Sequence, residues 1–431
     1  MDARSQLRLL PLAFFSVVFA FCSAAHGQSI EESISAAFDS NPDLEVADAN
    51  IDVARAGVGQ ARAAYRPQIS FQSSISAAER DARLPGGNSF QETSEPVSAT
   101  ISAQQPLYTN GLRTIASRQA VLGVREQRLL RDASKESLAL TVIDVYASLS
   151  QTQEDLQISI ETERLLSDQV RAEEERLRLG TGTRTDVSQV QARLARARAE
   201  ISRQRFQLQS IRASFELVTG LVPERVSWPN ELPSVPPGID LAVSEGRENS
   251  ARLAATRTSS ERARLDVASA NRRYGPQVSL NIEASTAREP SPAIDQDDEV
   301  RASLSLSLPL FSGGRKTADR REAIARRSAS LAALRSEDIA LVQDITSAWY
   351  RLESANAELS AVAAEISAAE ATLEGVSRGR SAGLWSVTDV LDAAEQLNTA
   401  KRRRVAARAS RDAAQFQLSI LTGRYTLPET F

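Results

Sequence analysis

The chain has 431 residues, with 51 lysines and arginines against 55 aspartates and glutamates and a formal net charge of −4. It contains one methionine, one cysteine and one histidine, and all three lie within the first 27 residues. The remaining chain therefore offers no disulfide, no usual zinc or haem ligands and no cysteine or histidine nucleophile. Because there is also no basic excess for nucleic acid, we expect neither an enzyme nor a protein that binds a cofactor, a metal or nucleic acid.

Residues 1–27 have the pattern of a secretory signal peptide. Arg4 and Arg8 precede an apolar stretch at 9–22 that is too short to span a bilayer comfortably, and the small residues Ala25 and Gly27 suit cleavage after residue 27. An uncleaved anchor is the alternative. After cleavage the net charge is −5, because 49 basic residues remain against 54 acidic ones. No later apolar run reaches the roughly 18 residues that a transmembrane helix needs, so none is expected.

The rest of the chain contains one pattern written twice. "QPLYTNGLR" at 105–113 matches "LPLFSGGRK" at 308–316, with a shift of 203 residues. "YRPQISF" at 65–71 matches "YGPQVSL" with a shift of 209, and the six extra residues fall around the loop-like "LPGGNSF". We therefore predict two repeats and a tail, and the proline-rich linker between the repeats rules out a long helix there. The predicted segments are 28–220, the linker 221–240, 241–423 and the tail 424–431.

Each repeat predicts the same order of elements: a helix, two strands, a very long helix, a tip and a shorter helix. In the first repeat these are helix 30–65, strands 67–84 and 96–108, helix 112–179, tip 180–185 and helix 186–218. In the second repeat they are helix 241–273, strands 276–289 and 299–311, helix 315–382, tip 383–388 and helix 389–421.

The strand segments alternate between apolar and small polar residues. "VRASLSLSLPLF" places Val300, Leu304 and Leu306 on one face and Arg301 and Ser303 on the other, which is a period of two. Such strands of about ten residues are typical of a transmembrane β-barrel, and a soluble two-sided sheet is the alternative. Four strands cannot close a barrel in lipid without leaving unsatisfied backbone groups. Several copies must therefore share one barrel, with 8 strands from two chains or 12 from three.

Both long helices carry an apolar seven-residue repeat. Val142, Leu149 and Leu156 share one heptad position in the first, and Ile345 and Leu352 share it in the second. This period predicts a coiled coil, and about 68 residues at 1.5 Å each give roughly 100 Å. The two shorter helices of a repeat, stacked end to end, match the length of the long one and can run antiparallel beside it. The expected fold class is mainly α with β, in which long antiparallel coiled-coil helices form an α-barrel continuous with the shared β-barrel.

These motifs together resemble the TolC family of outer-membrane efflux and secretion channels. The resemblance rests on "NPDL" at 41–44, on the paired strand motifs quoted above, and on the tips "LGTGTRTDV" and "AGLWSVTDVLDA". It implies a homotrimer with a 12-stranded barrel in the outer membrane, a long periplasmic α-barrel and an equatorial region near the linker. It further implies an exit duct that docks on a periplasmic adaptor and an inner-membrane RND or ABC transporter, in a tripartite efflux pump or a type I secretion system.

In this family the tips form the periplasmic gate. The resemblance places the gate aspartates at Asp389 and Asp392, and the first repeat offers Asp186 in the same setting. In a trimer such carboxylates form rings of three, which select cations, and like-charge repulsion is expected to raise some of their pKa values. The alternative is that the aspartates simply begin solvated helices, where the macrodipole favours acidic residues.

The chain departs from the family at the side chains that hold the gate shut. Arg380 and Trp385 occupy the positions of the usual tyrosine and arginine. We hypothesise that Arg380 pairs with Asp186, with Arg184 as a further guanidinium, and that Trp385 serves as a docking side chain or a hydrophobic plug. The expected adaptor-docking tip residues are Gly180, Thr181, Gly182, Gly383, Leu384 and Trp385.

The sequence alone is also compatible with two other functions. One is a periplasmic adaptor or structural coiled coil without a membrane barrel. The other is a carboxylate hydrolase using Asp389, which is disfavoured because no pocket-forming motif accompanies that residue. The sequence does not indicate the cargo of a duct, because a lining of serine, glutamine and mixed charges forms no specific pocket.

Overall fold

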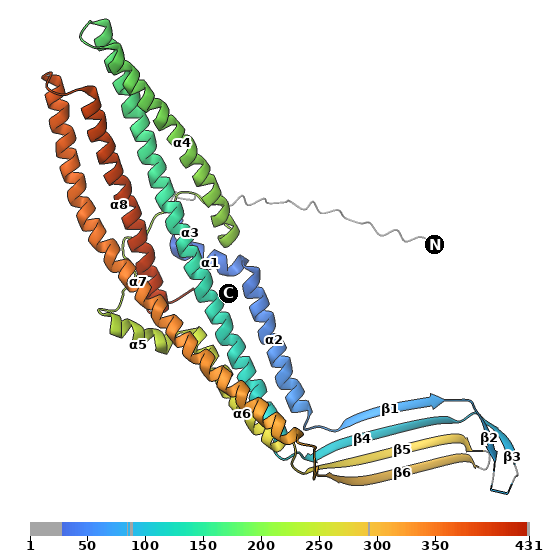
Figure 1. Cartoon of the computed structure of the whole chain (residues 1–431). Coiled ribbons are helices and arrows are strands. Elements are labelled where there is room, and N and C mark those ends of the chain that lie inside the picture. The colour runs from blue at the N-terminus through green and yellow to red at the C-terminus, as the bar shows by residue number, and fades with distance from the viewer. Residues whose placement is uncertain (1–27, 84, 87–88, 292–293, 429–431) are drawn as a thin grey trace, which may run out of the picture.

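A computed structural model of the chain describes residues 28–83, 85–86, 89–291 and 294–428. The molecule is elongated, with long helices side by side and a sheet projecting at an angle from one end of them (Figure 1). The expected signal peptide, with Cys22 and His26, lies outside the described residues. Within the described ranges, no helix combines the length and the apolar character needed to cross a membrane.

The described residues form eight helices, of which the two longest, α3 and α7, have 67 residues each. Helices α2 and α4 lie end to end along α3, and α6 and α8 lie end to end along α7 (Figure 1). The helices are α1 Ile30–Ser40, α2 Pro42–Ala63, α3 Leu112–Arg178, α4 Arg184–Thr219, α5 Ile239–Asn249, α6 Ala251–Arg272, α7 Arg315–Ser381 and α8 Val387–Leu421.

The first helix predicted in each repeat is in fact two helices. Asn41 has extended backbone angles, its side chain accepts a hydrogen bond from the Asp43 backbone N–H, and Pro42 begins α2. Proline has no N–H to donate and is tolerated only in the first turn, so Asn41 caps a new helix. Ser250 makes the equivalent break by accepting from the Leu253 N–H. The predictions of single helices over 30–65 and 241–273 are therefore wrong at these two residues.

Four strands form one antiparallel sheet in the order β1-β4-β5-β6, and β2 and β3 form a separate hairpin at its far end (Figure 1). The expected strand 67–84 is divided between β1 and β2, β3 occupies an expected loop, and β6 ends at residue 307 rather than 311, just before Pro309. The strands are β1 Gln68–Ile75, β2 Ala78–Arg83, β3 Ser89–Ser94, β4 Val97–Tyr108, β5 Gln277–Ser291 and β6 Ile294–Ser307.

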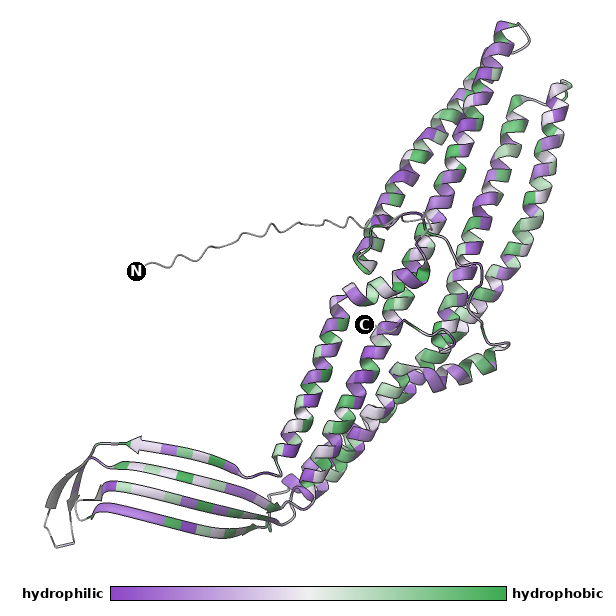
Figure 2. Cartoon of the chain, turned by 180° about the vertical axis from the view of Figure 1, so that it is seen from behind, coloured by the Kyte–Doolittle hydropathy of each residue, from purple (hydrophilic) through white to green (hydrophobic). Residues whose placement is uncertain are grey.

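The strand register gives the sheet one apolar and one polar face. Phe71 lies opposite Ile101, Ile101 opposite Ala284, and Ala284 opposite Val300. The neighbouring row, on the other face, runs Ser70, Ser102, Glu283 and Arg301. In one chain the apolar face is open, since Phe71 is 68% and Val300 81% exposed, and none of the eight described helices covers the sheet (Figure 2).

The largest apolar core lies in the middle of the helical part, where α1, the linker and the end of α8 pack against α3. The buried Tyr146 hydroxyl lies 2.7 Å from the Ser227 carbonyl oxygen and 2.8 Å from that of Gln28, and its ring meets Trp228 edge-on. The linker is therefore fixed to α3 by buried contacts. Together, α1, the linker and the end of α8 form an additional layer against the middle of the long helices.

A half-buried carboxyl at this level, that of Glu136, gives a pH prediction. Burial raises the pKa of Glu136 from 4.5 to about 7, although the Ala251 N–H at the start of α6 lowers it. The stabilisation from Glu136 is therefore fully present below about pH 4.5 and is lost as the pH rises through 7. We expect Glu136→Gln to raise the free energy of unfolding at pH 8 by on the order of 2 kcal/mol, a value already reduced for the partial exposure of the side chain. At pH 4 we expect the same substitution to have little effect on the free energy of unfolding. Thermal unfolding between pH 4 and 8 measures this. The exposed Glu216→Gln is the control, and identical pH profiles for all three proteins would contradict the assignment.

Candidate gate and docking tips

Both long helices end in the same tight turn. Gly180 and Gly383 each have φ of 77°, in the left-handed region that favours glycine. The N–H groups of Thr181 and Leu384 reach back to the carbonyls of Arg176 and Gly379, which satisfies carbonyls that would otherwise be free at the helix ends. The two tips lie at the end of the molecule farthest from the sheet (Figure 1).

Each tip passes directly into a capped helix. Asp186 accepts hydrogen bonds from the Thr183 N–H and hydroxyl, and Asp389 accepts them from Ser386 at 2.8 and 2.6 Å, so both form capping boxes. The Ser386 hydroxyl, and then its N–H, hold the pKa of Asp389 below its usual range. Within one chain, therefore, the pKa shift at Asp389 is opposite in direction to the rise expected from crowding.

The hypothesis that Arg380 pairs with Asp186 is wrong in this chain. Arg380 of α7 instead donates a hydrogen bond to Glu173 of α3, with 2.7 Å between Nη2 and Oε1. The Glu173 side chain is only 1% exposed and that of Arg380 11%, and Gln169 donates to the same carboxylate oxygen. A buried ion pair thus joins the α7–α8 hairpin to the α3–α4 hairpin. Breaking a pair of this kind costs about 3–5 kcal/mol, because the remaining charge stays buried.

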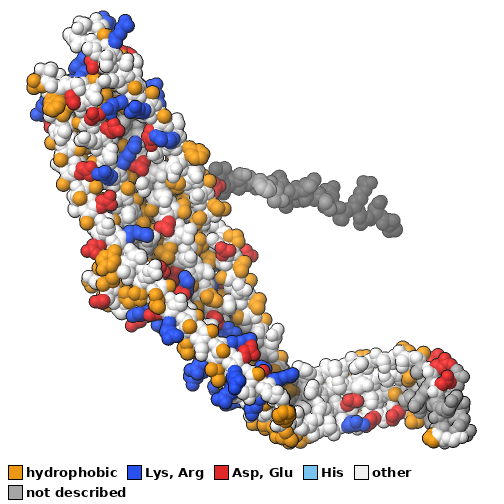
Figure 3. All heavy atoms as spheres, in the orientation of Figure 1, with side chains coloured by type: hydrophobic (Ala, Val, Ile, Leu, Met, Phe, Trp, Pro, Cys, Tyr) orange, Lys and Arg blue, Asp and Glu red, His pale blue; other side chains and the backbone are white. Residues whose placement is uncertain are grey.

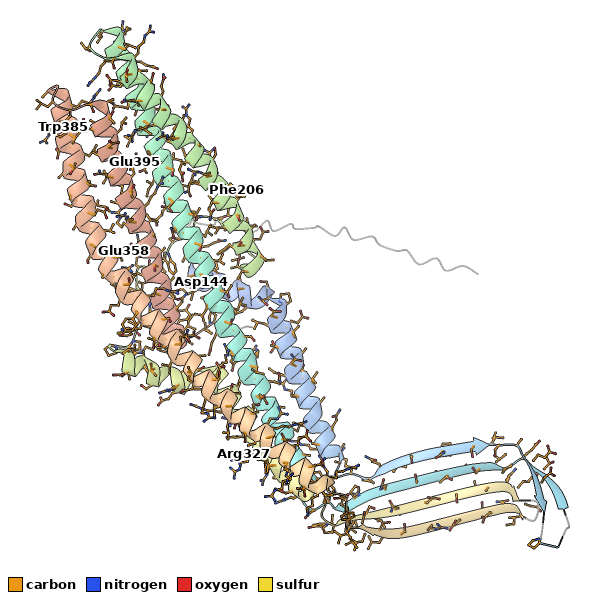
Figure 4. The ribbon with its side chains drawn as sticks, in the orientation of Figure 1. Asp144, Phe206, Arg327, Glu358, Trp385 and Glu395 are labelled. Carbon is orange, nitrogen blue, oxygen red and sulfur yellow. The ribbon has the colours of Figure 1, made fainter. Side chains whose placement is uncertain are left out.

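A second contact joins the hairpins through Arg193 of α4. Its Nη1 donates to Glu395 at 2.6 Å and its Nη2 to Asp392, both on α8, and Figure 4 marks Glu395 there. Thr388 and Gln189 add a hydrogen bond of 2.7 Å across the same junction. Asp392 is therefore occupied by a guanidinium within its own chain.

Neither Glu173 nor Arg193 is among the functional residues predicted from the sequence. A signal existed for Glu173, which falls seven residues after Leu166 and fourteen after Ser159, in a row that packs toward a neighbouring helix. A charged residue at such a position marks a specific partner. Arg193 had no comparable signal, because it is one of many arginines on α4.

The remaining tip residues face outward. Leu384 is 78% and Trp385 50% exposed, and Figure 4 shows Trp385 at the very end of the hairpin. The Trp385 ring lies against the backbone of Gly379, where an added Cβ would collide with its Cδ1. Arg184 is exposed and forms no ion pair with the described residues. No group of three or more potential metal ligands occurs among those residues either.

Two long helical hairpins with exposed tips, joined to a sheet that exposes an apolar face, define a subunit of an outer-membrane channel with a periplasmic helical part. The family model described as outer membrane efflux protein matches residues 33–221 and 242–424. The chain belongs to this family, and its place is the outer membrane. The resemblance seen in the sequence and the expected fold class, mainly α with four sheet strands per chain, are confirmed.

Relatives match over nearly the whole chain. The outer membrane efflux protein BepC of Brucella suis is 25% identical over 94% of this chain and 87% of its own length. The outer membrane protein TolC of Salmonella enteritidis is 23% identical over 93% of this chain and 83% of its own. The solved structure of the outer membrane protein VceC from Vibrio cholerae superposes with a TM-score of 0.78 at 19% identity, covering 91% of this chain and 96% of that one.

Proposed function

We propose that three copies of the chain form an exit duct from the periplasm to the exterior, in a tripartite efflux pump or a type I secretion system. The observation that supports it is that the chain has two unpartnered edges that suit each other. Helix contacts give the order α2-α3-α6-α7 near the sheet and α4-α3-α8-α7 near the tips. Helices α2 and α4 are therefore one edge of the layer, and α7 is the other.

The α2 and α4 edge exposes apolar residues at coiled-coil spacing. On α2, Val46, Ala49, Val53 and Ala56 recur at intervals of three and four residues, and all are exposed. On α4, Phe206 is 76% exposed, and in Figure 4 it points away from the other helices. A seam of this kind is stable in water only when a partner helix covers it.

The α7 edge exposes small residues at the same spacing. Ala357, Ala361, Ala364 and Ala368 are all exposed, and they leave room for larger side chains such as Phe206. Because the two edges belong to opposite sides of one chain, their pairing is head-to-tail, and such pairing gives a ring when the rotation between copies closes. The sheet has the same arrangement, since β1 and β6 are its outer strands and each has one edge that no described strand pairs with. Pairing of β6 with β1 of the next copy gives a barrel of 12 strands for three chains and satisfies the backbone in lipid.

The proposed gate lies at the tips. Asp186, Asp389 and Asp392 supply the carboxylates, and Arg380 holds the second hairpin to the first through Glu173. Arg184, which is exposed and unpaired among the described residues, is proposed to meet a carboxylate of a neighbouring copy or of the adaptor. Energy comes from an inner-membrane RND or ABC transporter, and the periplasmic adaptor docks on Gly180, Thr181, Gly182, Gly383, Leu384 and Trp385.

The proposal also assigns the segments of the chain. Residues 28–220 and 241–423 are the repeats that build the wall, 221–240 is the equatorial linker, and 1–27 is the export signal. The membership of the family favours this duct over a periplasmic adaptor without a membrane barrel.

Phe206→Asp tests the ring. Three buried carboxylates at the α4–α7 joint have no partner, so we expect monomers where the unaltered protein gives a heat-modifiable trimer in the membrane fraction. Leu384→Asp is the matched control, because Leu384 is equally exposed in one chain but lies at the tip. A stable trimer with Phe206→Asp would overturn the proposed joint.

A further inference from the structure

The first turns of α7, next to the sheet, carry an unusual density of positive charge. Residues 315–327 contain six basic and two acidic residues, a net charge of +4. Lysine and arginine side chains gather at this end of the helices (Figure 3), and Figure 4 marks Arg327 among them. We call the six exposed basic residues the basic collar: Arg315, Lys316, Arg320, Arg321, Arg326 and Arg327.

Most of this charge is not neutralised within the chain. Glu322 forms an ion pair with Arg326, and Asp319 forms one with Arg273, the residue that follows α6. Among the described residues, the other five side chains of the basic collar form no ion pair. Folding alone does not account for five uncompensated cations within about three and a half turns of helix, because like charges repel one another. In a trimer there would be fifteen.

The position of the basic collar relates it to the membrane. Leu310 and Phe311, 92% and 91% exposed, separate it from the apolar face of the sheet. From Arg315 to Arg321 the helix rises about 9 Å, and the polar layer of a bilayer is roughly 5–8 Å thick on each side. The order along the molecule is therefore apolar strand face, exposed Leu and Phe, then cations. It matches the order of acyl chains, interface and phosphate groups in a membrane.

The opposite end of the sheet has the opposite charge. Asp295, Asp297, Asp298 and Glu299 follow one another closely near the start of β6. The positive charge is thus specific to the end of the sheet that joins the helices. A need for solubility alone does not explain it, because charges of either sign would serve that need.

Part of the basic collar faces the outside of the wall. Arg321 shares a seven-residue row on α7 with Arg335 and Val342, and Val342 lines a surface pocket with residues of α5. Asp338, four residues before Val342, is bonded to Arg247 of α5. Helix α5 is added to one face of the layer of long helices, and a duct requires the other face to be free for the lumen. The face that carries α5 and Arg321 is then the outer one.

From charge, position and facing, we infer that the basic collar binds the headgroup phosphates of anionic phospholipids in the membrane leaflet on the helical side. This surface goes beyond the proposed duct, and rests on it only in taking the sheet as the membrane-spanning part. The lipid contacts fix the depth and tilt of the barrel, because each salt-sensitive ion pair resists displacement of the helix ends from the phosphate plane.

The test uses the purified full-length protein in a neutral detergent, titrated with phosphatidylglycerol or with phosphatidylcholine, and counts bound lipids by native mass spectrometry. We expect a preference for phosphatidylglycerol that weakens with salt. Because each basic side chain contributes about fivefold, the triple change of Arg315, Arg320 and Arg321 to Gln is expected to lower the apparent affinity for phosphatidylglycerol about 100-fold. Phosphatidylcholine binding is expected to stay the same. The control changes three exposed arginines far from the sheet to Gln, namely Arg205, Arg335 and Arg404.

Three outcomes would overturn the inference: no preference for the anionic lipid, an equal loss in the control, or displacement of the lipid by equimolar inorganic phosphate. Single-channel conductance of the unaltered protein, measured separately in planar bilayers, tests the proposed duct function independently of lipid binding. Absent conductance together with selective lipid binding would reject the duct and keep the lipid surface, and the reverse result would reject the lipid surface alone.

Discussion

Replacing Arg380 by alanine is expected to raise the resting conductance of the channel several-fold. The change leaves the Glu173 carboxylate, only 1% exposed, without its guanidinium. Loss of one partner of a buried pair costs about 3–5 kcal/mol, and the trimer contains three such pairs. The closed arrangement of the two hairpins loses this stabilisation, whereas an arrangement that hydrates Glu173 does not require it. Single-channel recording in planar bilayers measures the effect.

The matched control for this experiment is Arg378→Ala. Arg378 lies two residues away on α7, but its ion pair with Glu374 is exposed, with its own side chain 77% accessible. Such surface pairs contribute about 0–1 kcal/mol, so the conductance is expected to stay at its original value. Arg193→Ala, which frees Asp392 and Glu395 together, is expected to act in the same direction as Arg380→Ala. A trimer of normal stability with unchanged conductance after Arg380→Ala would show that this pair does not hold the gate.

Leu304→Arg is expected to abolish the trimer in the outer membrane. Leu304 is 68% exposed in one chain, lies opposite Leu280, and stands near the middle of the apolar stretch of β6. An arginine facing lipid near the middle of a bilayer costs about 2–4 kcal/mol, so the three copies of a trimer lose roughly 6–12 kcal/mol. Membrane fractionation followed by electrophoresis with and without heating measures the loss.

Ser303→Arg is the matched control for the sheet. Ser303 is the adjacent residue on β6 and faces the polar side, opposite Asn281. Because the register of a strand sends neighbouring side chains to opposite faces, the same arginine there meets water in the lumen. We expect normal trimers with altered ion selectivity. Equal tolerance of both arginines would contradict a membrane-spanning sheet.

Much of the fold could be predicted from local pattern. Alternation along 300–308 indicates a strand, and heptad rows such as Val142, Leu149 and Leu156 indicate the long helices, because backbone hydrogen bonding fixes these periods within a few residues. The break between α1 and α2 also has a local signal, the pair Asn41-Pro42. The helical pattern on both sides of this pair nevertheless favours one continuous helix. Register, strand order and the added β3 depend on pairing between distant segments, and no local period encodes them.

The candidate site also has some features that local sequence predicts and others that depend on tertiary packing. The positions of the tips and of the carboxylates beside them follow from local turn and cap chemistry, at Gly180, Gly383, Asp186 and Asp389. The charges that meet across the hairpins depend instead on how distant helices pack. Arg380 and Glu173 are 207 residues apart in the sequence. Along an α-helix the direction of the side chain rotates by about 100° per residue, so a small difference in packing changes which side chains meet. The choice of Glu173 over Asp186 therefore depends on how the α7–α8 hairpin packs against the α3–α4 hairpin, which the sequence near either residue does not specify.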